Sequence, residues 1–134
     1  MFILSQRSLN NLSGVHPDLV QVIKRAIEIT PYDFGVTRGM GTVEEQQELV
    51  EKGVSTTMNS LHLPQHDGYS HAVDLGVYID GKLTWEHKYF RKVIQAVFTA
   101  AIELGVQVEA GGLWRDFIDS PHIQLNPKYY GVGS

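Results

Sequence analysis

Residues 72–85 read AVDLGVYIDGKLTW and predict a β-hairpin. Side chains alternate along a strand, so the apolar residues at 73, 75 and 77 share one face while Asp74 lies on the other. The Asp-Gly pair at 80–81 is typical of a two-residue hairpin turn, and residues 82–85 form the returning strand. We expect the apolar face to pack on the core. Asp74 then lies on the opposite face, where its small neighbours Ala72 and Gly76 leave room around it.

Two amphipathic helices flank this hairpin in the sequence. Proline is favoured at the first helical position, so His16-Pro17 opens the first helix, which carries an apolar stripe and ends before Pro31. The second spans residues 86–104, and Gly105 is its C-terminal signal. A capping box at 42–45, TVEE, predicts a further helix over 43–51. Residues 5–12 predict a helical turn or two.

Short strands complete the expected elements. We expect them at 34–37, 106–110 and 122–125, with a long polar loop over 54–70. Loops of this length in a compact domain are often functional. Helices and strands do not alternate regularly, and the strands cluster late with hairpin chemistry. The predicted fold class is therefore α+β, with a small, mainly antiparallel sheet packed with helices.

The composition is that of one globular domain over residues 1–134. With 43% hydrophobic and 19% charged residues, disorder is not indicated. A net charge of −4 with scattered basic residues argues against nucleic-acid binding. No apolar run approaches the roughly 18 residues of a membrane span, and the N-terminus lacks the parts of a secretory signal peptide. We therefore expect synthesis in a cytoplasm and no membrane insertion, and nothing demands more than a monomer.

The chain has six histidines and no cysteine, so nitrogen and oxygen must hold any transition metal. Imidazoles and carboxylates gather at 60–75, SLHLPQHDGYSHAVDL, and at 119–122, DSPH. In the first stretch three histidines compete to join Asp74. His71 adjoins Ala72 and points away from Asp74 if the strand has begun there. Spacing alone does not choose between His62 and His66.

The second stretch places a carboxylate three residues before an imidazole. A catalytic zinc usually has three protein ligands and keeps its fourth position for water. If His122 binds a metal, Asp119 can lie close by without ligating it, where a base takes a proton from water. Alternatively, residues 119–121 are merely a turn and His122 is a partly buried strand residue.

Together these motifs resemble the VanY-type D,D-/L,D-peptidases, and most closely phage endolysins that are L-alanyl-D-glutamate endopeptidases. The family pattern is S-x-H, a short gap, G-x-A-x-D and a late D-x-x-H. Here SLH at 60–62, AVD at 72–74 and DSPH at 119–122 match it. The similarity covers nearly the whole chain, including GVHPD at 14–18, TVEEQ at 42–46 and GGLW at 111–114. It implies a hedgehog/D-Ala-D-Ala peptidase-like fold.

The resemblance implies a zinc endopeptidase of peptidoglycan that cuts between L-alanine and D-glutamate in the stem peptide. The implied Zn²⁺ ligands are His62, Asp74 and His122. The implied general base is Asp119, which takes a proton from water and returns it to the leaving amine.

Four further residues are candidates for substrate contacts. Arg38 or His71 would help to stabilise the oxyanion of the intermediate. Tyr69 and Trp114 would line the cleft, unless both are packing residues.

Three departures from the family pattern bear on these roles. Residues 63–70 contain an insertion of about five residues, which carries His66, and Ser70 stands where the pattern has Gly. Members usually carry Arg in a G-x-R-T segment and often in S-R-H, where this chain has Gly41 and Leu61. In relatives the first of these arginines is thought to hold substrate or the oxyanion, and Arg38 could substitute for it.

Two other functions remain open on the sequence. One is a D,D-carboxypeptidase acting on D-Ala-D-Ala, and the other is a non-catalytic, zinc-stabilised domain that binds the cell wall. The resemblance to holin-dependent endolysins implies that the protein stays in the host cytoplasm until another protein makes a membrane lesion. It then acts on the periplasmic cell wall.

Overall fold

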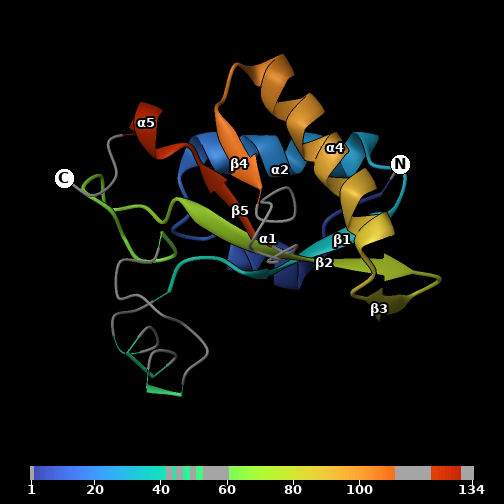
Figure 1. Ribbon diagram of the computed structural model, residues 1–134, viewed down its shortest axis with the longest axis horizontal. Helices are drawn as coiled ribbons and strands as arrows, with labels where there is room; N and C mark the ends of the chain where they lie inside the picture. Colours follow the sequence, from blue (N-terminus) through green and yellow to red (C-terminus); the bar gives the residue numbers. More distant parts are fainter. Residues whose placement is uncertain are drawn as a thin grey trace.

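The computed structural model of the protein describes residues 2–41, 44, 47, 48, 51, 52, 61–110 and 122–130. Helices and a five-stranded sheet make up this part of the chain (Figure 1). In chain order the elements are α1 (Gln6–Asn11), α2 (Pro17–Ile29), β1 (Asp33–Arg38), β2 (Ala72–Ile79), β3 (Lys82–Thr84), α4 (His87–Leu104), β4 (Val108–Ala110), β5 (His122–Leu125) and α5 (Pro127–Tyr130).

The long strand β2 organises the sheet. It pairs with β1 along one edge and with β3 and then β5 along the other, and β4 extends the sheet beyond β5. All four of these pairings are antiparallel. The predicted α+β class with a mainly antiparallel sheet is confirmed.

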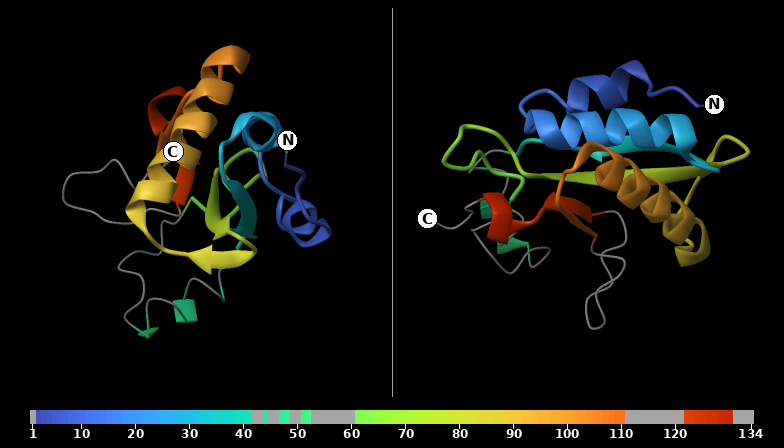
Figure 2. Two further views of the ribbon diagram at one scale, coloured as in Figure 1. Left: turned by 90° about the vertical axis from the view of Figure 1, so that its right-hand side faces the viewer. Right: turned by 90° about the horizontal axis from the view of Figure 1, so that it is seen from above.

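The apolar face of β2 belongs to the hydrophobic core. Val73, Leu75 and Val77 are buried, as the alternation predicted. The buried stripes of α2 and α4 contact each other and cover this face, and both helices lie above β2 in Figure 1 and in the left view of Figure 2. Full burial of a large aliphatic side chain contributes about 1.5–3 kcal/mol, so these residues strongly favour one register of the strand.

The opposite face of β2 is less open than expected. At Gly76, an added Cβ would lie 2.8 Å from a Leu83 methyl and 3.0 Å from a Thr37 methyl. Side chains of the two neighbouring strands therefore cover this glycine. Room beside Asp74 must lie toward the beginning of β2, away from the hairpin turn.

The start of β4 and the presence of α5 differ from the predictions made from the sequence. β4 begins two residues later than predicted because Val106 belongs to the cap of α4: its N–H bonds to the Ala101 carbonyl at 2.9 Å after left-handed Gly105. α5 was not predicted, since four residues are too few for an apolar stripe.

The predicted helix over 43–51 lies largely outside the described residues. The described positions within it, 44, 47, 48 and 51, are helical. Among the helices that the structure describes, none is both long and apolar enough to cross a membrane.

α1 lies along β1 and constrains the segment that follows this strand. Ser8 Oγ accepts a hydrogen bond from the Val36 N–H at 3.0 Å, and Asn11 Nδ2 donates to the Val36 carbonyl at 2.8 Å. Gly39 then passes so close to α1 that an added Cβ would lie 1.7 Å from the Asn11 carbonyl oxygen. Only glycine fits at this crossing.

We expect Gly39→Ala to destabilise the protein, because the new methyl group would overlap a backbone oxygen that cannot turn aside. Overpacking of this kind costs about 1–3 kcal/mol, measurable by urea unfolding. Gly35→Ala is the comparison, since its nearest neighbour is the movable Ser8 side chain at 3.0 Å. Equal stabilities for Gly39→Ala and the unmodified protein would contradict the prediction.

Candidate metal centre

The sheet register places three candidate residues side by side. Asp74 of β2 is paired with Arg38 of β1 and with His122 of β5. Directly opposed residues of antiparallel strands point to the same face of the sheet. A register shift between Val36 and Arg38 brings Arg38, at the end of β1, opposite Asp74. Arg38 and His122 are therefore the cross-strand neighbours of Asp74 on its two sides.

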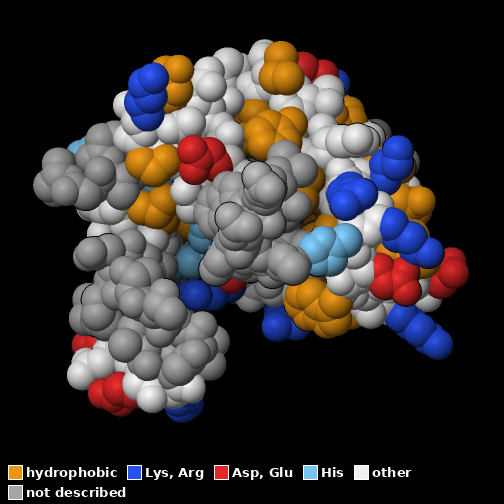
Figure 3. All heavy atoms as spheres, in the orientation of Figure 1, with side chains coloured by type: hydrophobic (Ala, Val, Ile, Leu, Met, Phe, Trp, Pro, Cys, Tyr) orange, Lys and Arg blue, Asp and Glu red, His pale blue; other side chains and the backbone are white. Residues whose placement is uncertain are grey.

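His62 reaches the same carboxylate from the segment that precedes β2. Its Nε2 lies 3.2 Å from Asp74 Oδ1, and His122 Nδ1 lies 3.2 Å from the same oxygen. One donor atom from each of the three residues lies within 4.8 Å of the others. His62 is buried, whereas Asp74 and His122 are partly exposed, so the group can be reached from solvent. On the face that Figure 3 shows, histidine atoms adjoin basic side-chain atoms in a hollow.

These separations fit a tetrahedral zinc ion. With zinc–ligand bonds of about 2.0–2.1 Å, two ligand atoms of a tetrahedron lie about 3.3 Å apart. The two nitrogen–oxygen distances of 3.2 Å are close to this value. Three ligands would leave a fourth position, as catalytic zinc sites do.

The outer nitrogen of His62 has the partner that a metal ligand requires. Nδ1 lies 2.9 Å from the Gly39 carbonyl, which can only accept, so Nδ1 carries the proton. Nε2 then presents its lone pair toward Asp74. Histidine ligands are usually oriented in this way, by donating their second N–H to a carbonyl or carboxylate.

His122 has the same arrangement, but here Nε2 is the outer nitrogen and Nδ1 faces Asp74. Its Nε2 lies 2.7 Å from Gln124 Oε1, and Gln124 Nε2 donates to Glu109 Oε2 at 2.9 Å. Because a carboxylate can only accept, this second bond fixes the orientation of the Gln124 amide. His122 Nε2 therefore donates to Gln124, and Nδ1 is left with its lone pair toward Asp74.

The carboxylate between the two rings is ionised near neutral pH. Burial works to raise the pKa of Asp74, but the hydrogen bonds and positive charges that His122 and His62 supply when they are protonated toward it outweigh burial and lower the pKa below the usual carboxyl range. Three electron-pair donors thus converge, an arrangement that a proton or a cation stabilises. Two imidazoles and a carboxylate suit zinc in a chain without cysteine.

The cross-strand neighbour of Asp74, Arg38, carries a buried guanidinium nitrogen. Its Nη2 is buried and has no hydrogen-bond partner among the described residues. An unpaired buried donor costs about 1–3 kcal/mol, so such a group is uncommon and is typical of strained, catalytic or ligand-binding positions. Paired with Asp74 in the register, Arg38 can donate to an anionic ligand at the centre.

The remaining predicted residues lie elsewhere or outside the described part of the chain. Asp119 and Trp114 are outside the described residues. His71 is 0% exposed and continues the core face of β2, opposite to Asp74. Tyr69 is 40% exposed and its ring contacts His16, at 5.6 Å between centroids.

The structure brings His62, and not His66, to Asp74. His66 is exposed, and its ring lies beside His71, with 6.1 Å between centroids. The choice that spacing left open is thus resolved in favour of the first histidine of the stretch.

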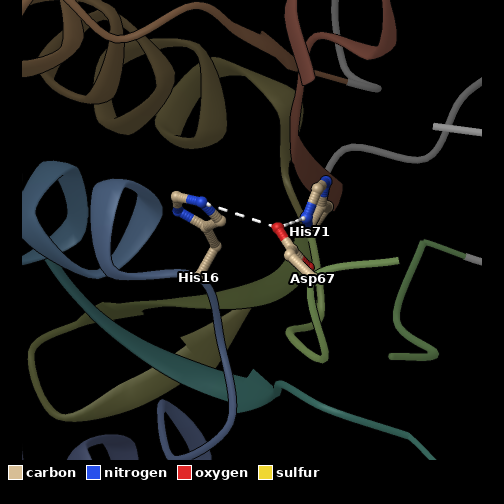
Figure 4. Close-up of side chains that lie close together, drawn as sticks. All are labelled: His16, Asp67 and His71. Atoms are coloured by element: carbon tan, nitrogen blue, oxygen red, sulfur yellow. Dashed lines mark hydrogen bonds and ion pairs between the residues drawn. The ribbon is translucent and has the colours of Figure 1, made fainter. Parts of the chain in front are cut away.

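A second group of donors has a similar composition but different outer partners. His16, Asp67 and His71 lie within 4.8 Å of one another (Figure 4). His16 Nδ1 accepts from the Asp18 N–H at 3.0 Å, and His71 Nδ1 is buried with no partner among the described residues. If the Nε2 atoms bound a metal, both Nδ1 atoms would carry protons with no acceptor. This group is therefore a hydrogen-bonded cluster around a carboxylate.

Two residues that bind the outer nitrogens of the histidines, Gln124 and Gly39, were not predicted from the sequence. Gln124 follows His122 by two positions on an expected strand, so the alternation rule placed it on the same face. Gly39 acts through its backbone carbonyl, for which no side-chain signal exists.

Comparison with known proteins identifies the family. The model of the phage L-alanyl-D-glutamate peptidase family matches residues 1–126. The chain belongs to this family. The predicted family and the prediction of a peptidase are both confirmed.

Named relatives of this peptidase come from a phage and from bacteria. It is 32% identical to the L-alanyl-D-glutamate peptidase of Escherichia phage T5, over 92% of this chain and 98% of that one. It is 25% identical to the peptidoglycan L-alanyl-D-glutamate endopeptidase CwlK of Bacillus subtilis strain 168, over 92% and 83%. The crystal structure of the Serratia marcescens L-Ala D-Glu endopeptidase ChiX is similar, with a TM-score of 0.86, 40% identity and coverage of 96% and 93%.

Proposed function

We propose that this peptidase is a zinc-dependent endopeptidase that hydrolyses the L-alanyl-D-glutamate bond of the peptidoglycan stem peptide. The convergence of His62, Asp74 and His122, each imidazole supported by an outer acceptor, carries the proposal. The names of the phage T5 relative and of ChiX specify this bond, and that of CwlK specifies peptidoglycan.

His62 Nε2, Asp74 Oδ1 and His122 Nδ1 would hold the zinc ion. When bound, zinc polarises a carbonyl and lowers the pKa of water to about 7. One negative charge among the three ligands leaves a net positive charge at the centre, which favours the carbonyl oxygen of the substrate. The buried outer bonds of the two histidines would keep both rings in place during the reaction.

Asp119 is the proposed general base. It precedes the ligand His122 by three residues, with Pro121 restricting the connection. The Asp119 carboxylate would take the proton from the attacking water and give it to the nitrogen of the leaving D-glutamate.

Arg38 is the proposed partner for negative charge on the substrate. Its buried Nη2 and its position opposite Asp74 support donation to the oxyanion or to a substrate carboxylate. It would take the role of the family arginine that Gly41 replaces here. We further propose that Tyr69, which is 40% exposed, and Trp114 contact the substrate. His71 lies on the opposite face, and a different role is assigned to it below.

The proposed activity also implies a route to the substrate. As the resemblance to holin-dependent endolysins implies, the protein would pass from the host cytoplasm to the periplasmic cell wall through a membrane lesion. No part of the catalytic proposal depends on this route.

Incubation with purified Gram-negative peptidoglycan should release new amino groups, and mass spectrometry should find new amino-terminal D-glutamate. A chelator should stop the reaction, since the ligands alone cannot polarise the carbonyl. Asp119→Ala should keep its zinc and lose about 10²–10⁴-fold in kcat, the usual contribution of a general base.

Release of D-alanine instead would identify a D,D-carboxypeptidase. A zinc-loaded, folded protein that binds peptidoglycan without cutting it would identify a binding domain. Full activity of Asp119→Ala would remove the base assignment.

The purified protein should hold about one zinc ion, because its three ligands form one site. His62→Ala, Asp74→Ala and His122→Ala should each abolish binding at micromolar zinc, as measured by elemental analysis after dialysis. His66→Ala is the matched control, because this histidine belongs to the same segment and does not reach Asp74. Loss of zinc in His66→Ala with retention in His62→Ala would reassign the ligand.

Arg38→Ala should lower kcat/KM by about 10²-fold with zinc content unchanged, as loss of an oxyanion donor does. Arg38→Lys should recover part of this loss, since it keeps the charge but not the fork of donors. Lys82→Ala, on the exposed hairpin, is the control for a general change in charge. Unchanged kcat/KM in Arg38→Ala would show that this guanidinium does not contact the substrate.

A further inference from the structure

Asp67 accepts two hydrogen bonds and lies close to a second imidazole (Figure 4). Its Oδ1 accepts from the Tyr69 N–H at 3.0 Å, its Oδ2 accepts from His71 Nε2 at 2.8 Å, and His16 Nε2 lies 3.7 Å from Oδ2. Partial burial works to raise the pKa of Asp67, but the Tyr69 and His71 hydrogen bonds and the nearby imidazoles lower it below the usual value. The carboxylate is therefore a fixed negative charge at the tip of the loop between His62 and β2.

The two imidazoles are themselves immobilised. His71 is completely buried, and the His16 ring packs edge-on against it with 5.3 Å between centroids. His16 also contacts Tyr130 of α5, at 5.4 Å, and accepts the Asp18 N–H at the start of α2. Because that bond uses Nδ1, the neutral His16 ring carries its proton on Nε2, facing Asp67. The loop carboxylate thus binds to a rigid part of the fold.

Backbone hydrogen bonds connect this cluster to the metal ligand. The His71 N–H donates to the Leu61 carbonyl at 2.8 Å, and Ser70 Oγ donates to the same carbonyl at 3.2 Å. Leu61 directly precedes His62. The His16 N–H donates to the Ser70 carbonyl at 2.9 Å, which joins the end of the loop to the start of α2. The residues that hold Asp67 therefore also hold the chain next to His62.

From this arrangement we propose that Asp67 is a positioning residue for the metal ligand His62. It closes the inserted loop onto His16 and His71, so that the eleven residues between His62 and Asp74 keep the two donor atoms at ligating distance. Without this anchor the loop gains conformational freedom, and metal binding must remove it again. The inference rests on the proposed zinc centre, because it concerns how that centre is preorganised.

Asp67→Asn tests the proposal, since it removes the charge and keeps the size. We expect its zinc affinity, measured by competition with a chromophoric chelator, to fall about tenfold, the lower end of the loss caused by outer-shell substitutions. The unfolding midpoint of the metal-free protein should change little, because the core does not contain Asp67. kcat at saturating zinc should be largely retained.

Tyr130→Phe and His66→Ala are the controls. The first removes the bond from the Tyr130 hydroxyl to Asp18 Oδ2, 2.9 Å, and so disturbs the same cluster without releasing the loop. The second alters an exposed histidine next to Asp67. Both should keep the zinc affinity of the unmodified protein.

Three results would overturn the inference. One is an unchanged zinc affinity in Asp67→Asn, and another is an equal loss in Tyr130→Phe, which would indicate a general structural role. The third is two zinc ions per unmodified chain and one in Asp67→Asn, which would make the cluster a second metal site. If the unmodified protein bound no zinc, the proposed function would fail and the inference with it, and this outcome is distinct from the other three.

Discussion

The pairing of β2 with β1 and β5 is the constraint on which the candidate centre depends. It sets Asp74 opposite Arg38 on one side and His122 on the other. A slip of one residue would turn the carboxylate into the core and bring out the apolar side chains at 73, 75 and 77. Each buried aliphatic residue opposes that slip by about 1.5–3 kcal/mol. The hydrophobic core therefore determines where the polar donors lie, although none of its side chains belongs to the centre.

Two clusters have the same composition, two histidines and one aspartate. They differ in the hydrogen-bond partners of the histidine nitrogens that face away from the aspartate. At the first, His62 and His122 donate outward to oxygen acceptors, so their lone pairs converge on Asp74. At the second, His16 Nδ1 accepts a hydrogen bond from a backbone N–H, so the proton of the neutral ring is on Nε2, 3.7 Å from Asp67 Oδ2. The direction of one hydrogen bond thus separates a site suited to a cation from a site that holds a loop. Composition and spacing alone treat the two clusters as equal.

Local signals predicted most of the fold, and tertiary contacts account for what they missed. The hairpin, α2 and α4 follow from alternation, a turn dipeptide, proline and Gly105, all of which act over a few residues. The family motifs also pointed to the residues that gather at the candidate centre. By contrast, His16 was read only as the start of a helix, because its relation to Asp67 requires two distant segments to pack. Gly39 was missed because a carbonyl carries no residue identity, and the helix over 43–51 and Asp119 fall largely or wholly outside the described residues.

The three converging donors are widely separated along the chain, and His122 follows Asp74 by 48 positions. Such long-range pairings carry a larger loop-closure entropy cost than the local helices and the hairpin. During translation, the donor set cannot assemble before β5 has left the ribosome, because a nascent chain without β5 lacks the donor His122. A cation that binds the completed set stabilises only the folded state, so binding of a metal here would depend on the pairing of β2 with β5.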